Sequence, residues 1–155
     1  MLANDLDRRF PEDTSVRFHY LPTLRALAAL NAGKTAKAGE ELEPARRYEL
    51  AMNRLSVFAS FGAMYPAYVR GEALLADHQG SRAAAEFQKL IDHPGIVLAD
   101  PLGALAVLQT GRAWAIAGDH DKAKAAYQGF LTLWKDADAD IPILKQAKAE
   151  YAKLQ

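Results

Sequence analysis

A pattern of small and bulky residues occurs three times in this 155-residue chain. Its clearest copy lies within residues 104–136, where the turn Gly118-Asp119 separates two segments whose apolar residues have helical spacing. Small residues let two helix backbones approach closely, and aromatic rings fill the wider gaps beside them. This stretch therefore predicts two helices folded against each other as a hairpin. The residues that define the pattern are Gly111, Trp114, Ala123 and Tyr127.

The same intervals recur twice upstream. The second copy consists of Gly71, Leu74, Ala83 and Phe87, and the weaker first copy of Ala26, Ala29, Ala38 and Leu42. The small residues of the three second helices, Ala38, Ala83 and Ala123, are 45 and 40 residues apart. Repetition at this scale is typical of a solenoid, in which each helical hairpin buries its apolar face against its neighbours.

The order of small residue, aromatic, Ala and aromatic in paired helices resembles the tetratricopeptide repeat over roughly residues 19–136. Two copies match that family well, whereas the first lacks the Gly and both aromatics. The period is longer than the usual one of about 34 residues. The Pro that ends each repeat of the family is replaced by Leu50, Gly95 and Lys135. The resemblance implies an all-α fold, a right-handed superhelical stack of about three hairpins, with the angle between repeats left open.

A narrower resemblance concerns residues 64–105 and 133–154. These stretches are similar to the C-terminal repeat region of bacterial eukaryotic-like serine/threonine kinases and of related winged-helix regulators. The resemblance implies that the chain is part of a larger bacterial signalling protein.

The chain divides into a polar start and a helical domain. Residues 1–13 contain too little apolar surface to anchor a structure and predict a linker. Residues 14–155 predict the repeat domain, with hairpins at about 14–46, 64–92 and 101–135 and an amphipathic capping helix at about 141–154. Residues 47–63 form an insertion, for which we favour covering the edge of the first hairpin over a partner-binding loop.

Composition excludes several classes of function. Nineteen basic and nineteen acidic side chains balance, so no global field attracts nucleic acid or anionic lipid. The chain has no cysteine, which excludes disulfides and thiolate metal sites. No apolar run approaches the length of about 20 residues that spans a bilayer, and the first residues do not resemble a signal peptide. These features predict a soluble, cytoplasmic protein with no nucleic-acid partner and no membrane insertion.

The sequence offers no catalytic or metal site. Its four histidines, His19, His78, His93 and His120, are spread over separate elements without the spacing of metal ligands or of a nucleophile and its base. Asp136, Asp138 and Asp140 alternate as in a calcium loop, but the required Gly and Glu are replaced by Ile141 and Ala147. We therefore expect no cofactor, no metal and no enzyme activity.

Recognition of another protein is better supported. In tetratricopeptide repeats the first helices of successive hairpins line a concave groove, and steps of three and four residues keep side chains on one helical face. On that basis the predicted groove residues are Tyr20, Thr23, Leu27 and Leu30, then Tyr65, Tyr68, Glu72 and Leu75, then Leu105, Leu108 and Arg112. Core positions are an equally good interpretation of Leu27, Leu30, Leu105 and Leu108. Aromatic residues and Arg dominate binding hot spots, which favours Tyr65, Tyr68, Glu72 and Arg112.

The leading hypothesis is a protein-protein interaction module that binds a peptide or partner protein in the groove. The alternative is a structural module that self-associates into a homo-oligomer, so that the groove is filled by the chain itself or by a second copy. An enzyme with a site in residues 47–63 is the least favoured reading, and its test would be loss of hydrolysis on changing Asp92 or His93.

Overall fold

The structure is a computed structural model that describes residues 2–51 and 63–154. Within these residues every regular element is a helix, which confirms the all-α prediction. The elements in chain order are α1 (Leu2–Arg9), η1 (Val16–Tyr20), α2 (Leu21–Asn31), α3 (Thr35–Leu42), η2 (Glu43–Tyr48), α4 (Tyr65–Ala76), α5 (Gly80–Asp92), α6 (Pro94–Val97), α7 (Leu102–Ile116), α8 (His120–Leu133) and α9 (Pro142–Ala152).

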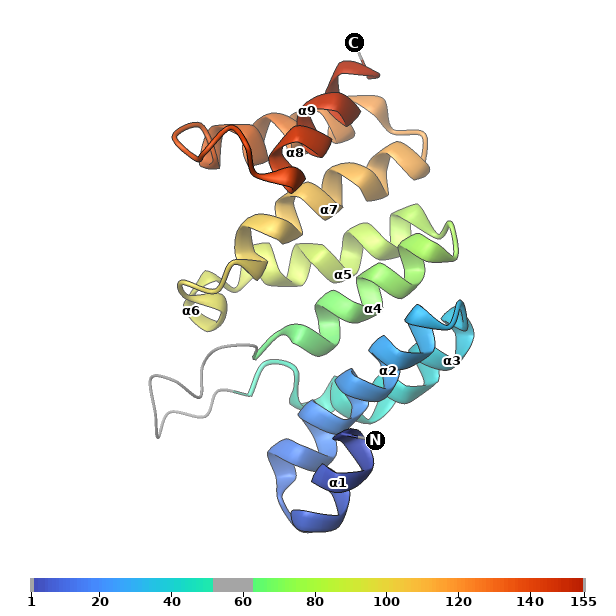
Figure 1. Cartoon of the computed structure of the whole chain (residues 1–155). Coiled ribbons are helices and arrows are strands. Elements are labelled where there is room, and N and C mark those ends of the chain that lie inside the picture. The colour runs from blue at the N-terminus through green and yellow to red at the C-terminus, as the bar shows by residue number, and fades with distance from the viewer. Residues whose placement is uncertain (1, 52–62, 155) are drawn as a thin grey trace.

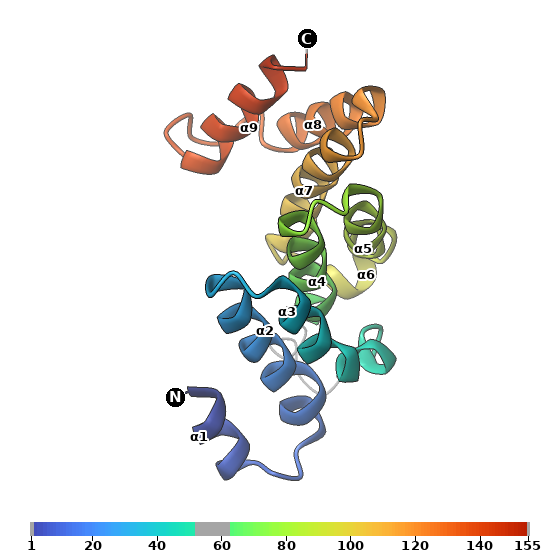
Figure 2. The ribbon, with the colours of Figure 1, turned by 90° about the vertical axis from the view of Figure 1, so that its right-hand side faces the viewer.

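Three helix pairs, α2–α3, α4–α5 and α7–α8, are stacked one after another along the molecule (Figure 1). Each predicted hairpin range contains one of these pairs, and α9 follows as the last helix. Seen from the side, α2 and α9 project in the same direction, and α4 and α7 are set back between them (Figure 2). The stack therefore has a recessed face formed by α4 and α7.

The turns inside the three pairs have the same backbone geometry. Each contains one residue with positive φ, namely Gly33 at 70°, His78 at 56° and Gly118 at 79°. In each turn the amide of the next residue donates a hydrogen bond to the carbonyl five residues earlier, as from Lys34 to Ala29, from Gln79 to Leu74 and from Asp119 to Trp114. This is the Schellman arrangement that ends helices. The repeat seen in the sequence is thus also a repeat of turn geometry.

Small residues let the paired helices approach closely, as the sequence predicts. A Cβ atom added at Gly71 would lie 2.5 Å from the Phe87 ring, and one added at Gly111 would lie 3.0 Å from the Tyr127 ring. Ala38, Ala83 and Ala123 are fully buried. A further close approach joins successive pairs, because a Cβ at Gly80 would lie 2.4 Å from the Ala113 carbonyl oxygen. Gly80, the first residue of α5, is therefore a packing residue between α5 and α7.

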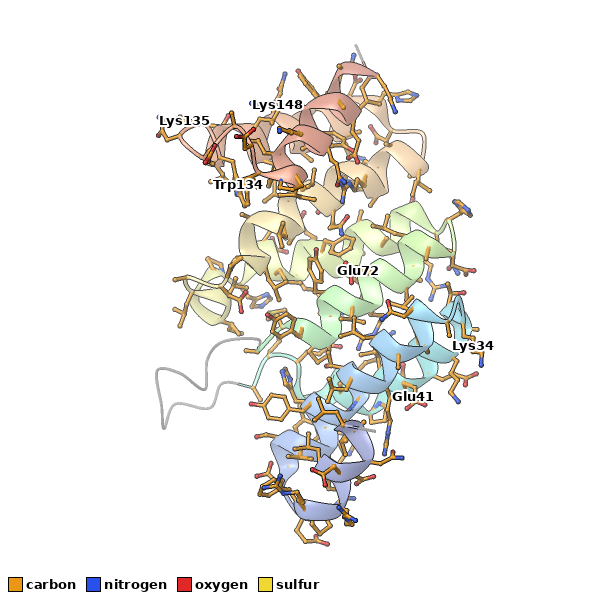
Figure 3. All side chains as sticks on the ribbon, viewed as in Figure 1. Lys34, Glu41, Glu72, Trp134, Lys135 and Lys148 are labelled. Carbon is orange, nitrogen blue, oxygen red and sulfur yellow. The ribbon has the colours of Figure 1, made fainter. Side chains whose placement is uncertain are left out.

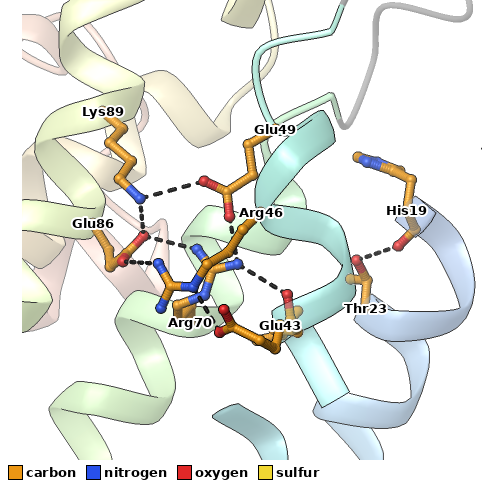
Figure 4. A network of polar contacts seen from close by, with 9 residues as sticks. His19, Thr23, Glu43, Arg46, Glu49, Arg70, Glu86 and Lys89 are labelled. Carbon is orange, nitrogen blue, oxygen red and sulfur yellow. Dashed lines mark hydrogen bonds and ion pairs between the residues drawn. The ribbon is translucent and has the colours of Figure 1, made fainter. Parts of the chain in front are cut away.

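A buried ionic cluster attaches the first pair to the second (Figure 4). Arg70 of α4 is 3% exposed. Its guanidinium donates to the Glu86 carboxylate at 2.9 Å and to the Leu42 carbonyl at 3.1 Å, and it forms an ion pair with Glu49. Lys89 also contacts both carboxylates, at 2.7 Å from Glu86 and 3.3 Å from Glu49. The segment that follows α3 is thereby held on α4 and α5.

One prediction for the ends of the first pair differs from the structure, and another concerns residues that the structure does not describe. Residues 2–9 form the helix α1, where the sequence predicts a linker. The helix is held to α2 by a 2.7 Å ion pair between Asp7 and Arg25, so charged side chains supply a contact that apolar content did not predict. Most of the predicted insertion 47–63, including residues 52–62, lies outside the described residues, and both roles considered for it stay predictions.

Candidate protein-binding groove

The recessed face contains a cleft of about 530 Å³, which we call the α4–α7 cleft. Its floor consists of short and branched apolar side chains from the last turns of α4 and α7, and its sides carry polar groups. The lining residues are Glu72, Leu75 and Ala76 of α4, Gln109, Arg112, Ala115 and Ile116 of α7, Tyr127 of α8, and Glu150 of α9. The cleft thus combines residues of four helices from three units of the stack.

Helical periodicity explains why these residues share one face. On α4 the lining positions follow steps of three and one, and on α7 they follow steps of three, three and one, which groups them along one side of each helix. The close contacts at Gly71 and Gly111 fix the rotation of α4 and α7 on their partner helices. The face that carries Glu72 is directed toward the viewer in Figure 3.

Gln109 links α4 to α7 at the centre of this face. Its side-chain nitrogen donates to the Tyr68 hydroxyl at 3.2 Å and lies 3.4 Å from a Glu72 carboxylate oxygen. Its side-chain oxygen accepts from Arg112 at 3.3 Å. One amide therefore connects three of the predicted groove residues, because it offers both a donor group and an acceptor.

Arg112 is held by the last helix. Its Nε and Nη2 atoms donate to the two Glu150 oxygens, both at 2.8 Å, and the Tyr127 hydroxyl donates to Glu150 at 2.9 Å. Burial raises the pKa of Glu150, but the hydrogen bonds from Arg112 and Tyr127 outweigh burial and lower it. Burial likewise lowers the pKa of Arg112, and Glu150 outweighs it in the opposite direction. Both groups are therefore charged at neutral pH and neutralise each other.

Glu72 has a different environment. It is half-buried, and burial raises the pKa of its carboxyl group; the Gln109 amide and the Arg112 charge oppose that rise without cancelling it. Tyr68 beside it is 8% exposed, and burial raises the pKa of its phenol to about 12. Glu72 therefore lies beside the neutral amide of Gln109 and near the neutral phenol of Tyr68.

The structure places several predicted groove residues in the interior. Leu108 is fully buried among Tyr127, Phe130 and Leu144, so it belongs to the core and cannot contact a partner. Thr23 is also buried, and its hydroxyl donates to the His19 carbonyl at 2.7 Å. The ring of Tyr68 packs edge-on against Phe87, so only its hydroxyl reaches toward the cleft.

The remaining predicted residues divide between the cleft and other surfaces. Glu72, Leu75 and Arg112 line the cleft. Tyr20, Leu27 and Tyr65 are exposed but are not among its lining residues. Leu30 is half-buried in the cluster of the first pair, and Leu105 packs partly on the core around Phe87.

Sequence reasoning missed Gln109, Ile116, Tyr127 and Glu150. The error on α7 was one of register, because the stepping passed through Leu108 and therefore left out Gln109. Steps of four, three and four from Leu105 reach Gln109, Arg112 and Ile116 and would have identified the face. No sequence signal could have identified Glu150, because its carboxylate reaches Arg112 only through the placement of α9.

A second cleft of about 560 Å³ lies between α3, α4 and α5. Its charged lining residues are Glu40, Glu43, Asp77, Arg46, Arg70 and Arg82. These charges balance, and Arg46 and Arg70 already contact Glu43 and Glu86. The α4–α7 cleft, with its apolar floor and Glu72, is therefore the better candidate for recognition.

The described residues show neither a metal site nor a membrane-spanning helix. Across residues 2–51 and 63–154 no group of three His, Cys, Asp or Glu side chains could hold a metal ion. None of the helices in the same ranges is long and apolar enough to cross a membrane.

Comparison with known proteins identifies a partial relative. The chain is 48% identical over 61 residues to the chaperone protein YscY of Yersinia enterocolitica, and equally so to YscY of Yersinia pestis. The match covers 39% of this chain and 48% of each relative, so the chain spans about half the length of the curated relatives it matches. No protein-family model matches the chain, and no solved structure matches it significantly. The resemblances to tetratricopeptide repeats and to kinase-associated regions therefore stay predictions.

Proposed function

We propose that this chain is a protein-binding module of chaperone type, which holds a segment of a partner protein in the α4–α7 cleft. The observation that carries the proposal is the cleft itself, in which an apolar floor and a few convergent polar groups are supplied by four helices. The partial similarity to a chaperone protein supports a protein-binding role. The role is one of binding, without catalysis.

The exposure of the cleft suits such a role. Ile116 is 43% exposed at the edge of the floor, although it is a large apolar side chain. Burying exposed apolar surface contributes about 25 cal/mol per Å² to association. Gln109 and Glu72 beside it supply polar groups that fix the orientation of a bound segment.

We also propose that the pairs are tetratricopeptide-like repeats, whose first helices form the binding face.

Site-specific photo-cross-linking in the native cells tests the proposal. A photoreactive phenylalanine analogue is placed at position 116, at the edge of the cleft, or at Leu133 as a control. Leu133 is an exposed residue of α8 that does not line the cleft. We expect a cross-linked partner from position 116 and little or none from position 133, with mass spectrometry identifying the partner.

The pattern of adducts separates the outcomes. The same partner captured equally from both positions, or no adduct from position 116, would contradict binding in the cleft. An adduct between two copies of this chain from position 116 would instead support the self-association alternative.

Membership of a larger signalling protein is a separate proposal that rests on the kinase-associated resemblance. Sequencing the gene on both sides of this segment tests it. Kinase motifs or a winged-helix sequence in the same reading frame would support it, and a frame that closes on both sides would contradict it.

A further inference from the structure

The charges that line the α4–α7 cleft do not balance. They are the carboxylates of Glu72 and Glu150 and the guanidinium of Arg112. Because Glu150 binds Arg112 through two hydrogen bonds of 2.8 Å, those two charges are paired. The cleft is left with one net negative charge, and that charge belongs to Glu72.

Glu72 is poorly satisfied by its own chain. Among the described residues, its hydrogen-bond partner is the Gln109 amide at 3.4 Å, which is long for a hydrogen bond to a carboxylate. Glu86, which is buried, and Glu150, which is half-buried, each have cationic partners within 3 Å. No ion pair to Glu72 occurs among residues 2–51 and 63–154. Half-buried carboxylates of this kind are stabilised when a cation approaches.

The surroundings of Glu72 select the shape of that cation. Leu75 and Ala76 follow it on α4, and Ala115 and Ile116 face them from α7. A side chain with an aliphatic stem and a charged end fits such a site, because the stem packs on the apolar floor while the end reaches the carboxylate. An acidic side chain would find Arg112 already occupied, and a purely apolar one would remove water from Glu72 without replacing its hydrogen bonds.

We propose that the α4–α7 cleft binds a lysine or arginine side chain of the partner segment, with its charged group on Glu72 and its stem on Leu75 and Ile116. This inference rests on the proposed function and adds the chemistry of the partner. It identifies Glu72 as the residue that determines specificity.

Peptide selection followed by affinity measurements tests the inference. A displayed library of random peptides is selected against the full chain, and the best binder is synthesised with blocked ends. Its affinity is measured by fluorescence anisotropy for the wild-type chain, for Glu72→Gln and for Glu41→Gln. Glu41 is a matched control, because it is a half-buried carboxylate on α3, away from Glu72 (Figure 3).

We expect the selected peptides to carry a Lys or Arg beside apolar residues. Changing that basic residue to Gln should weaken binding about fivefold for the wild-type chain and for Glu41→Gln, as for a partly exposed ion pair. Changing the same basic residue of the peptide to Gln should weaken binding to the Glu72→Gln chain less than about twofold. Acetylation of a Lys in the peptide keeps the aliphatic stem and removes the charge. This measurement needs the wild-type chain alone, so its result does not depend on the folding of a variant.

Two results would overturn the inference, and they have different consequences. If peptides shift the NMR signal of the Gln109 side-chain amide but bind equally well with or without a basic residue, the basic-side-chain inference fails and the binding function stands. If no selected peptide shifts that signal, the cleft is not the binding site, and the proposed function fails together with the inference.

Discussion

At the scale of single residues, the hairpins depend on a few positions where side chains would not fit. Gly71 faces the ring of Phe87, which is fully buried. Gly111 faces Tyr127 with a wider gap. The two positions are equivalent in the repeat, so they allow a comparison in which helix propensity is the same and only the fit differs.

We expect Gly71→Ala to lower the free energy of unfolding by about 1–3 kcal/mol, because the added methyl group would overlap the Phe87 ring at 2.5 Å. Gly111→Ala should cost at least about 1 kcal/mol less, because its gap of 3.0 Å needs a smaller shift and Ala favours the helix. Urea denaturation of both variants measures the difference. Equal effects would contradict the fit argument.

His78 has the opposite problem, because it adopts a backbone conformation that suits glycine. Its φ of 56° matches those of Gly33 and Gly118 in the equivalent turns. We expect His78→Gly to raise the free energy of unfolding by about 0.5–1 kcal/mol, since the left-handed conformation is unfavourable for a residue with a Cβ.

The control for His78 is Gly118→Ala, where a new Cβ would meet no atom within 4 Å. Any decrease in the free energy of unfolding of Gly118→Ala reports the cost of the left-handed backbone conformation alone, and we expect about 1 kcal/mol. Thermal unfolding of both variants is the measurement. A His78→Gly variant less stable than the wild type would mean that the imidazole makes a contribution larger than its strain.

At the scale of elements, α9 is attached by two kinds of contact. Leu144 and Ala147 are buried against Leu108, Tyr127 and Phe130. On the cleft side, Glu150 binds Arg112 and Tyr127. The apolar contact covers the end of the stack, as expected of a terminal helix in a repeat array, whereas the polar contact sets where α9 lies relative to the cleft.

The polar contact predicts a dependence on pH. The folded-state pKa of Glu150 is lowered, so its contribution to stability is present above the unfolded-state pKa and is lost as the pH falls through the folded-state value. We expect Glu150→Gln to be less stable than the wild type by up to about 1 kcal/mol at pH 7, since the pair is partly exposed. The difference should shrink as the pH falls below the ordinary pKa of Glu, about 4.3, and through the lower folded-state value.

Urea denaturation across this pH range measures that difference. Glu41→Gln, which has the same change of charge on α3, serves as control and should show a smaller and flatter difference. A gap between wild type and Glu150→Gln that stays constant from pH 7 to pH 3 would show that the Glu150 charge does not hold α9.

At the scale of the whole molecule, stability depends on the joints between successive pairs. The second and third pairs meet through the close approach of Gly80 to Ala113, whereas the first and second meet through the buried ions around Arg70 and through apolar residues of α4 that pack on the first pair. In repeat proteins each unit contacts only its neighbours, so weakening one joint affects the units on its two sides unequally. The ionic joint therefore controls the N-terminal part of the stack.

We expect Arg70→Met to lower the free energy of unfolding by about 3–5 kcal/mol, because the buried Glu49 and Glu86 lose the guanidinium between them and the partly exposed Lys89 compensates only in part. Hydrogen exchange should accelerate more in α2 and α3 than in α7 and α8. Arg82→Met on the exposed face of α5 is the control and should change stability by less than about 0.5 kcal/mol. Uniform acceleration along the chain would contradict a local joint.

The hairpins could be predicted from the sequence because their causes are local. Helical spacing, the glycines at the turns and the pairing of small with bulky residues act over short separations, so residues such as Gly111 and Tyr127 specify their own contact. The helix α1 was missed because residues 1–13 are mostly polar, whereas an ion pair between Asp7 and Arg25 contributes to the contact of α1 with α2. Leu108 was left open between groove and core, and the burial of Thr23 was missed, because one-face stepping does not show which faces of a helix its neighbours cover.

The α4–α7 cleft was only partly predictable, because the angle between pairs decides which side chains meet. Gln109 reaches Tyr68 across 41 positions in the sequence, and Glu150 reaches Arg112 across 38. The pairing of the helices and the position of their apolar faces follow from the sequence, because periodicity and side-chain size specify both. The ion pair that neutralises Arg112 and the unpaired charge of Glu72 in the cleft follow from the tertiary structure alone. Both depend on distances between helices, which no local pattern encodes.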